Sequence, residues 1–549
     1  MTEPLAPARN ARRSLWVERA VLVAILLVAA ALRVHGIGFG LPALNDPDEP
    51  LFMMTAVEML RNQSLNPGWF GHPGTITLYS LALVMLGVAG LGLATGRFDG
   101  AEGFVAAVYA DPAILFVPAR GMIAACGVLC VLLTWRLGRR LGGPRVGLIA
   151  AAILAVNAVH VQYSQVIRTD IQASVFMLLG LLAALQIQRT GKLRAYLFAG
   201  LAVGLGVATK WPAAAIALSP GAAGLWRIGK GHRGIGRLAL FGAVALATLI
   251  VASPYLLLDY QTVLQNLAGE ARPAHPGQSG QGFLDNLGWY AANPLLHSLG
   301  AAGLALAAAG TILLAWRRPR VAIAILPGIA ACAAILCFQA LRWDRWVVPL
   351  LPFLAIAAAY ALRLLSNLIR RRSGRRLRWL EPVAALLLGV PMLQATLADT
   401  HARLHDTRQI ASDWLRAHAP PGSSVLVEHA ALDLLHGGWR LKFPLGSAGC
   451  IDAHAALAGR IRYTQVERLR SDSPVIDLGH VDADQLESCR ADYAIFTHYD
   501  RYAAQHRYAS QLARYRALSR GGLVRAVIRP AEGLRAGPTV YIVELGPKR

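Results

Sequence analysis

The sequence predicts a polytopic α-helical membrane protein with a small α/β domain at its C-terminal end. Of its 549 residues, 55% are hydrophobic and only 15% are charged, whereas soluble domains carry about 25% charged residues. Apolar runs extend from residue 17 to residue 398, and each is near or somewhat short of the ~20 residues that cross hydrocarbon as a helix. The composition becomes more polar after Thr400. We therefore expect a membrane domain over residues 1–398 and a soluble domain over residues 399–549.

Short basic loops separate the apolar runs, as is typical of the cytoplasmic side of a membrane protein. The runs are 17–35, 73–95, 120–135, 146–167, 171–188, 195–209, 211–226, 238–258, 294–315, 321–341, 346–365 and 382–398. The basic clusters are Arg9 to Arg13, Arg136 to Arg145, Arg189 to Arg194, Arg227 to Arg237, Arg317 to Arg320 and Arg370 to Arg378. The 54 Lys and Arg residues outnumber the 31 acids, but their placement in loops accounts for the charge without nucleic acid as a partner.

The run 73–95 is expected not to cross the membrane. The N-terminus and the 136–145 loop are both predicted to be cytoplasmic, yet three runs lie between them. The run 73–95 is rich in glycine and follows "GHPG", and the loop 97–119 after it is acidic. We expect this run to lie near the outer leaflet, or to dip in and return, which leaves about eleven crossings and an outer C-terminus. The alternative is that the run spans and one basic cluster is misplaced.

Three carboxylates follow the first run in the stretch "NDPDEP", at Asp46, Asp48 and Glu49. Pro47 and Pro50 disfavour helix directly before each of them, and a helical pattern begins at Pro50. A single carboxylate here would serve as the acidic cap of a helix N-terminus. Three exceed what a cap requires, so the stretch indicates a functional site.

Six further ionisable residues stand at the predicted outer ends of the runs. They are His72, Arg168, Asp170, Lys210, Arg342 and Arg345. Lys210 is the most informative, because it lies at a turn between two apolar runs, and ionisable residues at membrane depth usually serve function. Snorkelling, capping and interface anchoring are the alternatives for the others. Carboxylates could deprotonate a nucleophile, and the cations could stabilise a lipid-linked phosphate as it leaves.

Several stretches resemble the GT-C-fold glycosyltransferases, in the same order along residues 15–370. They are "NDPDEPLF", "HPGTITLYSLAL", "VPARGMIAACGVLCVLLTWRLGRRLGG", "AAILAVNAVHVQYSQVIRTD", "GLAVGLGVATKW", "SPYLLLDY" and "RWDRWVVPLLPFLAIAAAYAL". The likeness is greatest to the bacterial branch related to protein O-mannosyltransferases and to the lipid A aminoarabinose transferase. Each stretch is weak alone, and their order and spacing make the resemblance specific. The expected fold is therefore GT-C-like, with interfacial helices beside the crossings.

The resemblance implies a membrane glycosyltransferase that moves a sugar from a polyprenyl-phosphate carrier to a periplasmic acceptor, with inversion at the anomeric carbon. The acceptor class, whether protein, lipid or polysaccharide, stays open. The family motif places the catalytic base at Asp48, with Glu49 beside it and Asp46 as an extra acid. Asp170 matches a second outer acid of the family, and Lys210 matches its Thr-Lys turn. The implied location is the bacterial inner membrane, with the site and the C-terminal domain on the periplasmic side.

Other features match the family's pattern only in part. His72 stands where a relative has Lys before Pro. The loop 259–292 matches a mobile family segment over the donor site, which makes His275 a candidate site residue, although a plain connector is the alternative. Arg342 and Arg345 could hold a phosphate or diphosphate through paired donors. A divalent metal on Asp46 and Asp48 is chemically feasible, but the family's nearest members work without one, so we predict no cofactor.

The polar C-terminal part predicts an α/β domain. "TRQIASDWLRAHAPPGSSVLVE" has the pattern of a helix, a turn and a strand, and "ADYAIFTHYD" and "TVYIVELG" have the pattern of buried strands. Cys450 and Cys489 could pair if this part is periplasmic, although spacing alone leaves the pairing open.

Two other functions fit parts of the sequence. A transporter or lipid flippase would suit charges at membrane depth, but it predicts internal repeats, and we find none. A non-catalytic assembly protein would tolerate replacement of all three acids in "NDPDEP".

Overall fold

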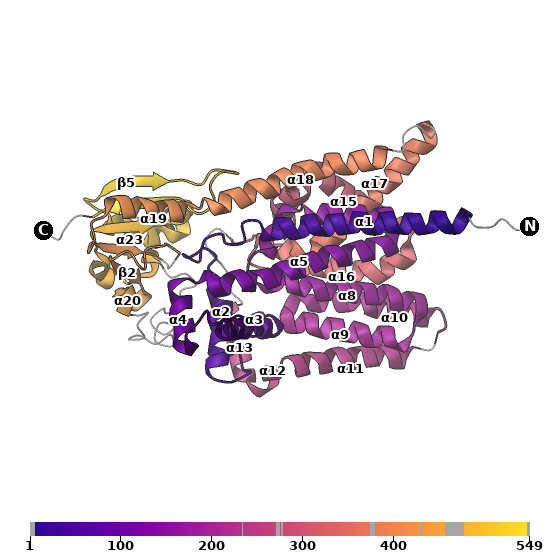
Figure 1. The fold of residues 1–549 in the computed structure, drawn as a ribbon, viewed down its shortest axis with the longest axis horizontal. Helices are drawn as coiled ribbons and strands as arrows, with labels where there is room; N and C mark the ends of the chain where they lie inside the picture. The colour runs from indigo at the N-terminus through magenta and orange to yellow at the C-terminus, as the bar shows by residue number, and fades with distance from the viewer. Residues whose placement is uncertain are drawn as a thin grey trace, which may run out of the picture.

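The computed structural model describes residues 6–232, 234–270, 275, 278–373, 379–428, 431–455 and 477–545. Its larger part is a bundle of helices that run side by side, and a smaller domain with a sheet sits at one end of the bundle (Figure 1). The bundle elements are α1 (Ala6–Val34), α5 (Ala113–Gly142), α6 (Pro144–Ala155), α7 (Ala158–Ser164), α8 (Thr169–Thr190), α9 (Leu193–Thr209), η1 (Trp211–Ala217), α10 (Leu218–Gly229), α11 (Ile235–Ala252), α14 (Phe283–Tyr290), η2 (Ala291–Leu295), α15 (Leu296–Arg317), α16 (Pro319–Phe338), η3 (Asp344–Leu350), α17 (Leu351–Ser373) and α18 (Leu380–Leu404).

The length and apolar character of these helices make the chain a multi-pass membrane protein. Within the described residues, nine helices could cross a membrane by length and composition, and the bent pair α6–α7 makes a tenth. The apolar helix α9 is shorter, and η1 continues directly into α10. The end of α10, the start of α11, the end of α17 and the start of α18 lie at the end of the bundle away from the sheet domain (Figure 1). Four of the predicted loop arginines, Arg233, Arg375, Arg376 and Arg378, lie outside the described residues.

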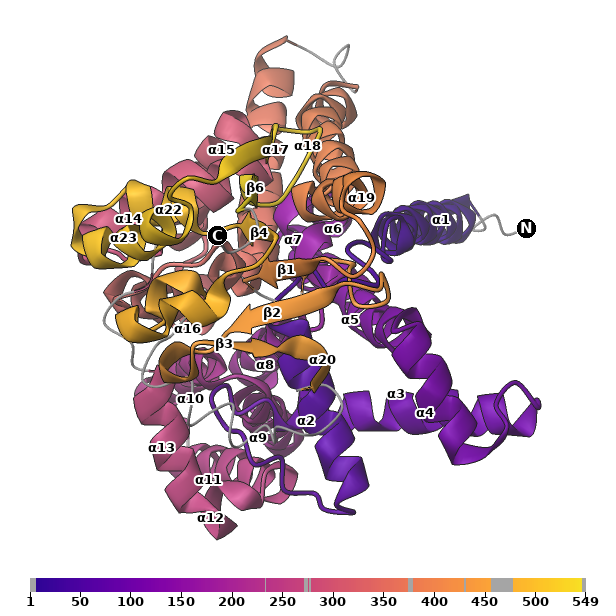
Figure 2. The ribbon, with the colours of Figure 1, turned by 90° about the vertical axis from the view of Figure 1, so that its left-hand side faces the viewer.

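One apolar helix does not follow the direction of the bundle. α3 (Thr75–Ala94) is long and apolar enough to span, but it is seen end-on where α1 is seen lengthwise (Figure 1), and lengthwise where α1 is seen nearly end-on (Figure 2). It therefore lies across the bundle, as the arrangement of the basic loops predicts. Without α3, the described residues hold eight such helices and the bent pair α6–α7, so the predicted number of about eleven crossings is reached only if the shorter α9 and the broken segment η1–α10 also cross.

Shorter helices gather beside α3 at the end that carries the sheet domain (Figure 1). They are α2 (Glu49–Arg61), α4 (Gly100–Ala110), α12 (Tyr255–Leu258) and α13 (Tyr260–Glu270). The buried side chains of α2 and α3 pack together with those at the start of α5, in a cluster that includes Phe52, Leu78 and Phe116. This packing places the start of α2, and hence the acidic stretch, against the ends of the spanning helices that lie toward the sheet domain.

The helices differ in how much of their surface other helices cover. Most residues of α8 and α17 are buried, whereas Phe241 is the single buried residue of α11. An apolar helix that is exposed nearly all round faces lipid in a membrane protein. The centre of the bundle is tight: a Cβ atom added at Gly310 of α15 would lie 1.9 Å from the carbonyl oxygen of Ala357 in α17, so only glycine permits this approach.

A buried arginine stabilises the break between α6 and α7, which bend by 64° at this point. Arg33 of α1 is fully buried and donates hydrogen bonds to the carbonyl oxygens of Leu154 at 3.3 Å and Ala155 at 3.1 Å. Its guanidinium also lies 2.8 Å from Nδ1 of His160. A break in a membrane helix leaves carbonyl groups without partners, and Arg33 supplies the donors.

The C-terminal domain contains a mixed six-stranded sheet of order β3-β2-β1-β4-β6-β5. Its elements are α19 (Thr407–His418), β1 (Ser424–Val427), β2 (Arg440–Pro444), η5 (Gly446–Ala448), β3 (Cys450–Asp452), α20 (Ala453–Ala455), η7 (Leu478–His480), η8 (Ala483–Cys489), β4 (Tyr493–Phe496), α22 (Tyr499–Ala503), η9 (His506–Tyr508), α23 (Ala509–Leu518), β5 (Leu523–Ile528) and β6 (Val540–Glu544). β1 is parallel to β2 and β4, and the other pairs are antiparallel. The predicted helix and the three predicted strands correspond to α19, β1, β4 and β6. The boundary expected at residue 398 lies inside α18, which ends at Leu404.

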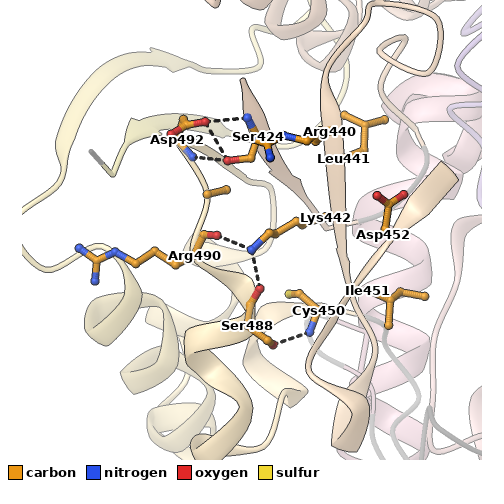
Figure 3. Close-up of a pocket in the computed structure, with 11 residues that line it drawn as sticks. Ser424, Arg440, Leu441, Lys442, Cys450, Ile451, Asp452, Ser488, Arg490 and Asp492 are labelled. Atoms are coloured by element: carbon orange, nitrogen blue, oxygen red, sulfur yellow. Dashed lines mark hydrogen bonds between the residues drawn. The ribbon is translucent and has the colours of Figure 1, made fainter. Parts of the chain in front are cut away.

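Cys450 and Cys489 form a disulfide, which settles the pairing that their spacing left open. The bond joins β3 to η8 beside a hollow of about 450 Å³ (Figure 3). In this hollow Lys442 donates hydrogen bonds to the carbonyl oxygens of Ser488 at 2.8 Å and Arg490 at 2.6 Å. The disulfide and the lysine together hold the edge of the sheet to η8.

Candidate active site

The stretch "NDPDEP" does not serve as a helix cap. Asp48 occupies the N-cap position of α2, but its side chain makes no capping hydrogen bond. Instead its backbone N–H donates to Oδ1 of Asp46 at 3.0 Å, and Pro50 stands in the first turn as expected. The carboxylate of Asp48 is therefore available for other contacts.

The carboxylates of Asp46 and Asp48 face the guanidinium of Arg168, which precedes α8 in extended conformation. Nη2 of Arg168 lies 3.0 Å and 3.2 Å from the two oxygens of Asp46, and Nη1 donates to Oδ2 of Asp48. Arg345 approaches the same oxygen of Asp48 from η3, at 3.7 Å. Residues from three distant parts of the chain thus form one cluster of opposite charges, as the sequence predicts.

Asp170 and Lys210 form a second ion pair beside this cluster. Asp170 lies in the first turn of α8, and Lys210 links α9 to η1. The side chain of Asp170 is almost wholly buried, and within the described residues its Oδ2 has no hydrogen-bond partner. Arg345 lies near both pairs and interacts electrostatically with Asp170 and Lys210.

His72 lies against the Lys210 turn. The backbone N–H of Trp211 donates to the carbonyl oxygen of His72 at 2.7 Å, and Nδ1 of His72 is 3.3 Å from Oγ1 of Thr169. The ring also contacts Trp69, with centroids 5.2 Å apart. His72 therefore lies at the site, with its imidazole between the ring of Trp69 and the start of α8.

Glu49 points away from the cluster, in contrast to its two neighbouring acids. Its carboxylate accepts hydrogen bonds from Arg120 of α5 at 2.9 Å and 2.6 Å, and from the backbone N–H of Ile167 at 2.9 Å. Both side chains of the pair are fully buried. Arg120 donates its remaining bonds to the carbonyl oxygens of Ile37 and Phe39. Glu49 is therefore placed to fix the acidic stretch rather than to meet a substrate.

Arg342 and His275 lie at the edge of the site, on two segments that pair with each other. The backbone N–H of Arg342 donates to the carbonyl oxygen of Gln278 at 2.9 Å, and its guanidinium lies 2.8 Å from Asp285. The ring centroids of His275 and Trp343 are 5.1 Å apart. The guanidinium of Arg345 also stacks on Trp343, 4.5 Å from the ring centroid. Residues 271–274 and 276–277 of this loop, including Gly277, lie outside the described residues.

Exposure distinguishes Asp48 from the other acids of the site. Its side chain is 35% exposed, against 15% for Asp46, 1% for Asp170 and 0% for Glu49. Among the described residues, no hydrogen bond reaches Oδ1 of Asp48. Asp48 is thus the most exposed of these four carboxylates, and its Oδ1 is open to a further contact.

The C-terminal domain contacts the acidic stretch directly. Arg408 of α19 donates to the carbonyl oxygen of Asn45 at 2.8 Å and is itself held by Asp406 through two bonds of 2.8 Å. Arg507 lies 3.1 Å from Oγ of Ser279, in the loop beside Arg342. The domain therefore contacts the bundle at two points beside the site, at Asn45 and at Ser279, and it lies over that end of the bundle in Figure 2.

Sequence reasoning missed several of these residues. Arg120 was visible as a lone arginine at the start of an apolar run, which is a signal for a buried partner in a membrane protein. Asp285 and Arg408 carried no local signal. Within the described ranges, no group of three or more His, Cys, Asp and Glu side chains is placed to hold a metal ion.

Residues 112–258, from α5 to α12, match the family model of dolichyl-phosphate-mannose-protein mannosyltransferase. The crystal structure of ArnT from Cupriavidus metallidurans in the apo state aligns with 98% of the chain and 100% of its own, with a TM-score of 0.54 and 15% identity. The chain has the GT-C fold. This likeness confirms the GT-C-like fold that the sequence motifs predict.

The GT-C match extends to a second ArnT structure from the same organism, bound to undecaprenyl phosphate. It aligns with 97% of the chain and 99% of its own, with a TM-score of 0.53 and 14% identity. No curated protein matches the sequence. The matched family segment contains Arg168, Asp170 and Lys210, whereas Asp46, Asp48 and Arg345 lie outside it.

Proposed function

We propose that the chain transfers a sugar from a polyprenyl-phosphate carrier to an acceptor at the outer face of a bacterial inner membrane, with inversion at the anomeric carbon. The observation that carries the proposal is the meeting of Asp48, the accessible carboxylate, with Arg345 and the Asp170–Lys210 pair. A base and a set of cations side by side are what displacement of a phosphate leaving group requires. The GT-C fold, and the lipid phosphate bound by ArnT, support the choice of donor.

Asp48 acts as the general base. Its Oδ1 takes the proton from an acceptor hydroxyl or amine, and the acceptor atom forms a bond to the anomeric carbon. The bond from that carbon to the phosphate oxygen breaks, and the phosphate leaves with the electron pair. Because the acceptor enters opposite the leaving group, the anomeric configuration inverts. Asp46 and Arg168 hold Asp48 in place through their mutual hydrogen bonds.

Arg345 and Lys210 bind the departing phosphate, with Arg342 at the edge. In the structure the guanidinium groups of Arg345 and Arg168 both form ion pairs with the carboxylate of Asp48. These ion pairs make Asp48 a weak base. A donor phosphate would compete with Asp48 for the guanidinium of Arg345 and so raise the basicity of the carboxylate. The base would thus become stronger when the leaving group is in place. We propose no metal for these steps.

The C-terminal domain and the loop at His275 are proposed to position the acceptor. Arg408 and Arg507 bring this domain to the acidic stretch and to the loop beside Arg342. The disulfide between Cys450 and Cys489 suits an oxidising compartment such as the periplasm.

Transfer should not respond to titration of Asp48 or His72 between about pH 5 and pH 8. Burial raises the pKa of Asp48, but the guanidinium groups of Arg168 and Arg345 outweigh it and hold the pKa below its usual range. Burial, aided by Lys210, lowers the pKa of His72 to about 3. Asp48 would lose its ionised form only as the pH falls through its lowered pKa. A pH–rate profile checks this: an acid limb near pH 6 that vanishes in His72→Gln would contradict it.

The proposed activity is tested by incubating the purified protein with polyprenyl-phosphate sugars and a periplasmic extract as acceptor. Mass spectrometry then looks for the released polyprenyl phosphate. Release by the wild-type protein, and none by Asp48→Asn, is the expected result. Movement of intact lipid-linked sugar across vesicles without any release would instead favour a flippase.

A further inference from the structure

A second hollow, of about 690 Å³, lies at the opposite end of the bundle from the site, where α5 ends, α6 begins and α8 ends. Four of the six residues that line it are arginines. Its walls are formed by Trp135, Arg136, Arg139, Arg140, Pro144 and Arg189. Figure 1 places this end away from the sheet domain, where the basic loops predict the cytoplasmic interface.

The positive charge in this hollow is largely uncompensated. Arg139 pairs with Glu18, at 2.8 Å, and Arg140 donates to the carbonyl oxygen of Leu182 at 3.3 Å. Within the described residues, Arg136 and Arg189 form no ion pair and donate no hydrogen bond. Both lie close enough to Arg140 to repel it.

Some other arginines at the same end share a carboxylate partner, which Arg136 and Arg189 lack among the described residues. Arg145, Arg363 and Arg370 all converge on the carboxylate of Glu381. Positive charge that serves only to orient the chain in the membrane needs no cavity. It also does not need unpaired guanidinium groups that line the same cavity. An anion completes such an arrangement, because guanidinium groups bind phosphate through paired N–H donors.

We propose that this hollow binds the phosphate group of an anionic membrane phospholipid from the cytoplasmic leaflet. Trp135 lies at its wall, and the guanidinium of Arg139 stands 5.6 Å from the ring. Tryptophan is enriched at the level of lipid headgroups, and basic pockets between membrane helices on this side suit phosphate headgroups. The proposal does not depend on the transfer reaction at the other end of the bundle.

The test compares two variants that each remove two exposed arginines from the same end of the molecule. Arg136→Gln with Arg189→Gln changes the hollow, and Arg317→Gln with Arg318→Gln changes the loop between α15 and α16, outside it. None of the four side chains forms a hydrogen bond or ion pair among the described residues, so both variants should fold. Native mass spectrometry measures the retention of added phosphatidylglycerol, with phosphatidylcholine as the neutral lipid.

The wild-type protein and the loop variant should retain phosphatidylglycerol in preference to phosphatidylcholine, and the hollow variant should bind it about tenfold more weakly. Equal retention by both variants, or no preference for the anionic lipid, overturns the proposal. Inorganic phosphate is added in a separate arm. If it displaces the lipid completely, the hollow belongs to a soluble phosphate compound and the lipid assignment is wrong.

Discussion

Asp48→Asn should lower the rate of sugar transfer by about 10²–10⁴. Asparagine keeps the shape of the side chain but cannot take a proton from the acceptor. Because the side chain is partly exposed and Arg168 keeps its second partner Asp46, the variant should fold with an unchanged thermal midpoint. The rate is measured as polyprenyl phosphate released per unit time.

Two matched variants control for this loss. Asp46→Asn removes a neighbouring charge that orients Arg168, so transfer should fall less than in Asp48→Asn. Glu58→Gln removes an exposed carboxylate of α2, whose contact is a hydrogen bond from Asn62, and should leave the rate unchanged. A normal rate in Asp48→Asn would remove Asp48 from the mechanism.

Arg120→Met should destabilise the protein by about 3–5 kcal/mol. The substitution leaves the carboxylate of Glu49 buried without its bidentate partner, and it removes the donors to Ile37 and Phe39. The thermal midpoint in detergent, compared with that of Glu58→Gln, reports the loss.

The double variant Arg120→Met with Glu49→Leu tests whether these two residues stabilise the protein as an ion pair or only by filling space. An apolar pair leaves no unpaired charge, so the double variant should be more stable than Arg120→Met alone. It should remain less stable than wild type, because the backbone N–H of Ile167 and the carbonyl groups of Ile37 and Phe39 lose partners. If the double variant were as unstable as the sum of its single changes, Glu49 and Arg120 would not act as a pair.

Features that depend on local patterns were predictable from the sequence. The orientation of α3 across the bundle follows from which loops are basic, and the elements α19, β1, β4 and β6 follow from short-range periodicity. The cluster around Asp48 was also predictable from topology, because the ends of crossing helices on one side of a membrane must meet at one face. Asp48, Arg168 and Lys210 lie at such ends.

Features that depend on side-chain direction were not predictable. Asp48 and Glu49 are adjacent in sequence, yet one faces Arg168 and the other turns to Arg120, because α2 packs between the start of α5 and the start of α8. That difference separates a reactive carboxylate from a buried one, and no local pattern encodes it. The pairing of the loop near Gln278 with Arg342 is likewise a product of tertiary packing.

The central claim is that the carboxylate of Asp48 takes the proton from the acceptor, and that Arg345 and Lys210 bind the lipid phosphate. Binding of polyprenyl phosphate to wild type, Asp48→Asn and Arg345→Gln, measured by native mass spectrometry, tests it without knowledge of the sugar. The account predicts that Asp48→Asn binds at least as tightly as wild type, because a negative charge beside the phosphate is removed, and that Arg345→Gln binds about tenfold or more weakly. Equal binding by Arg345→Gln and wild type, or loss of binding in Asp48→Asn, would contradict it.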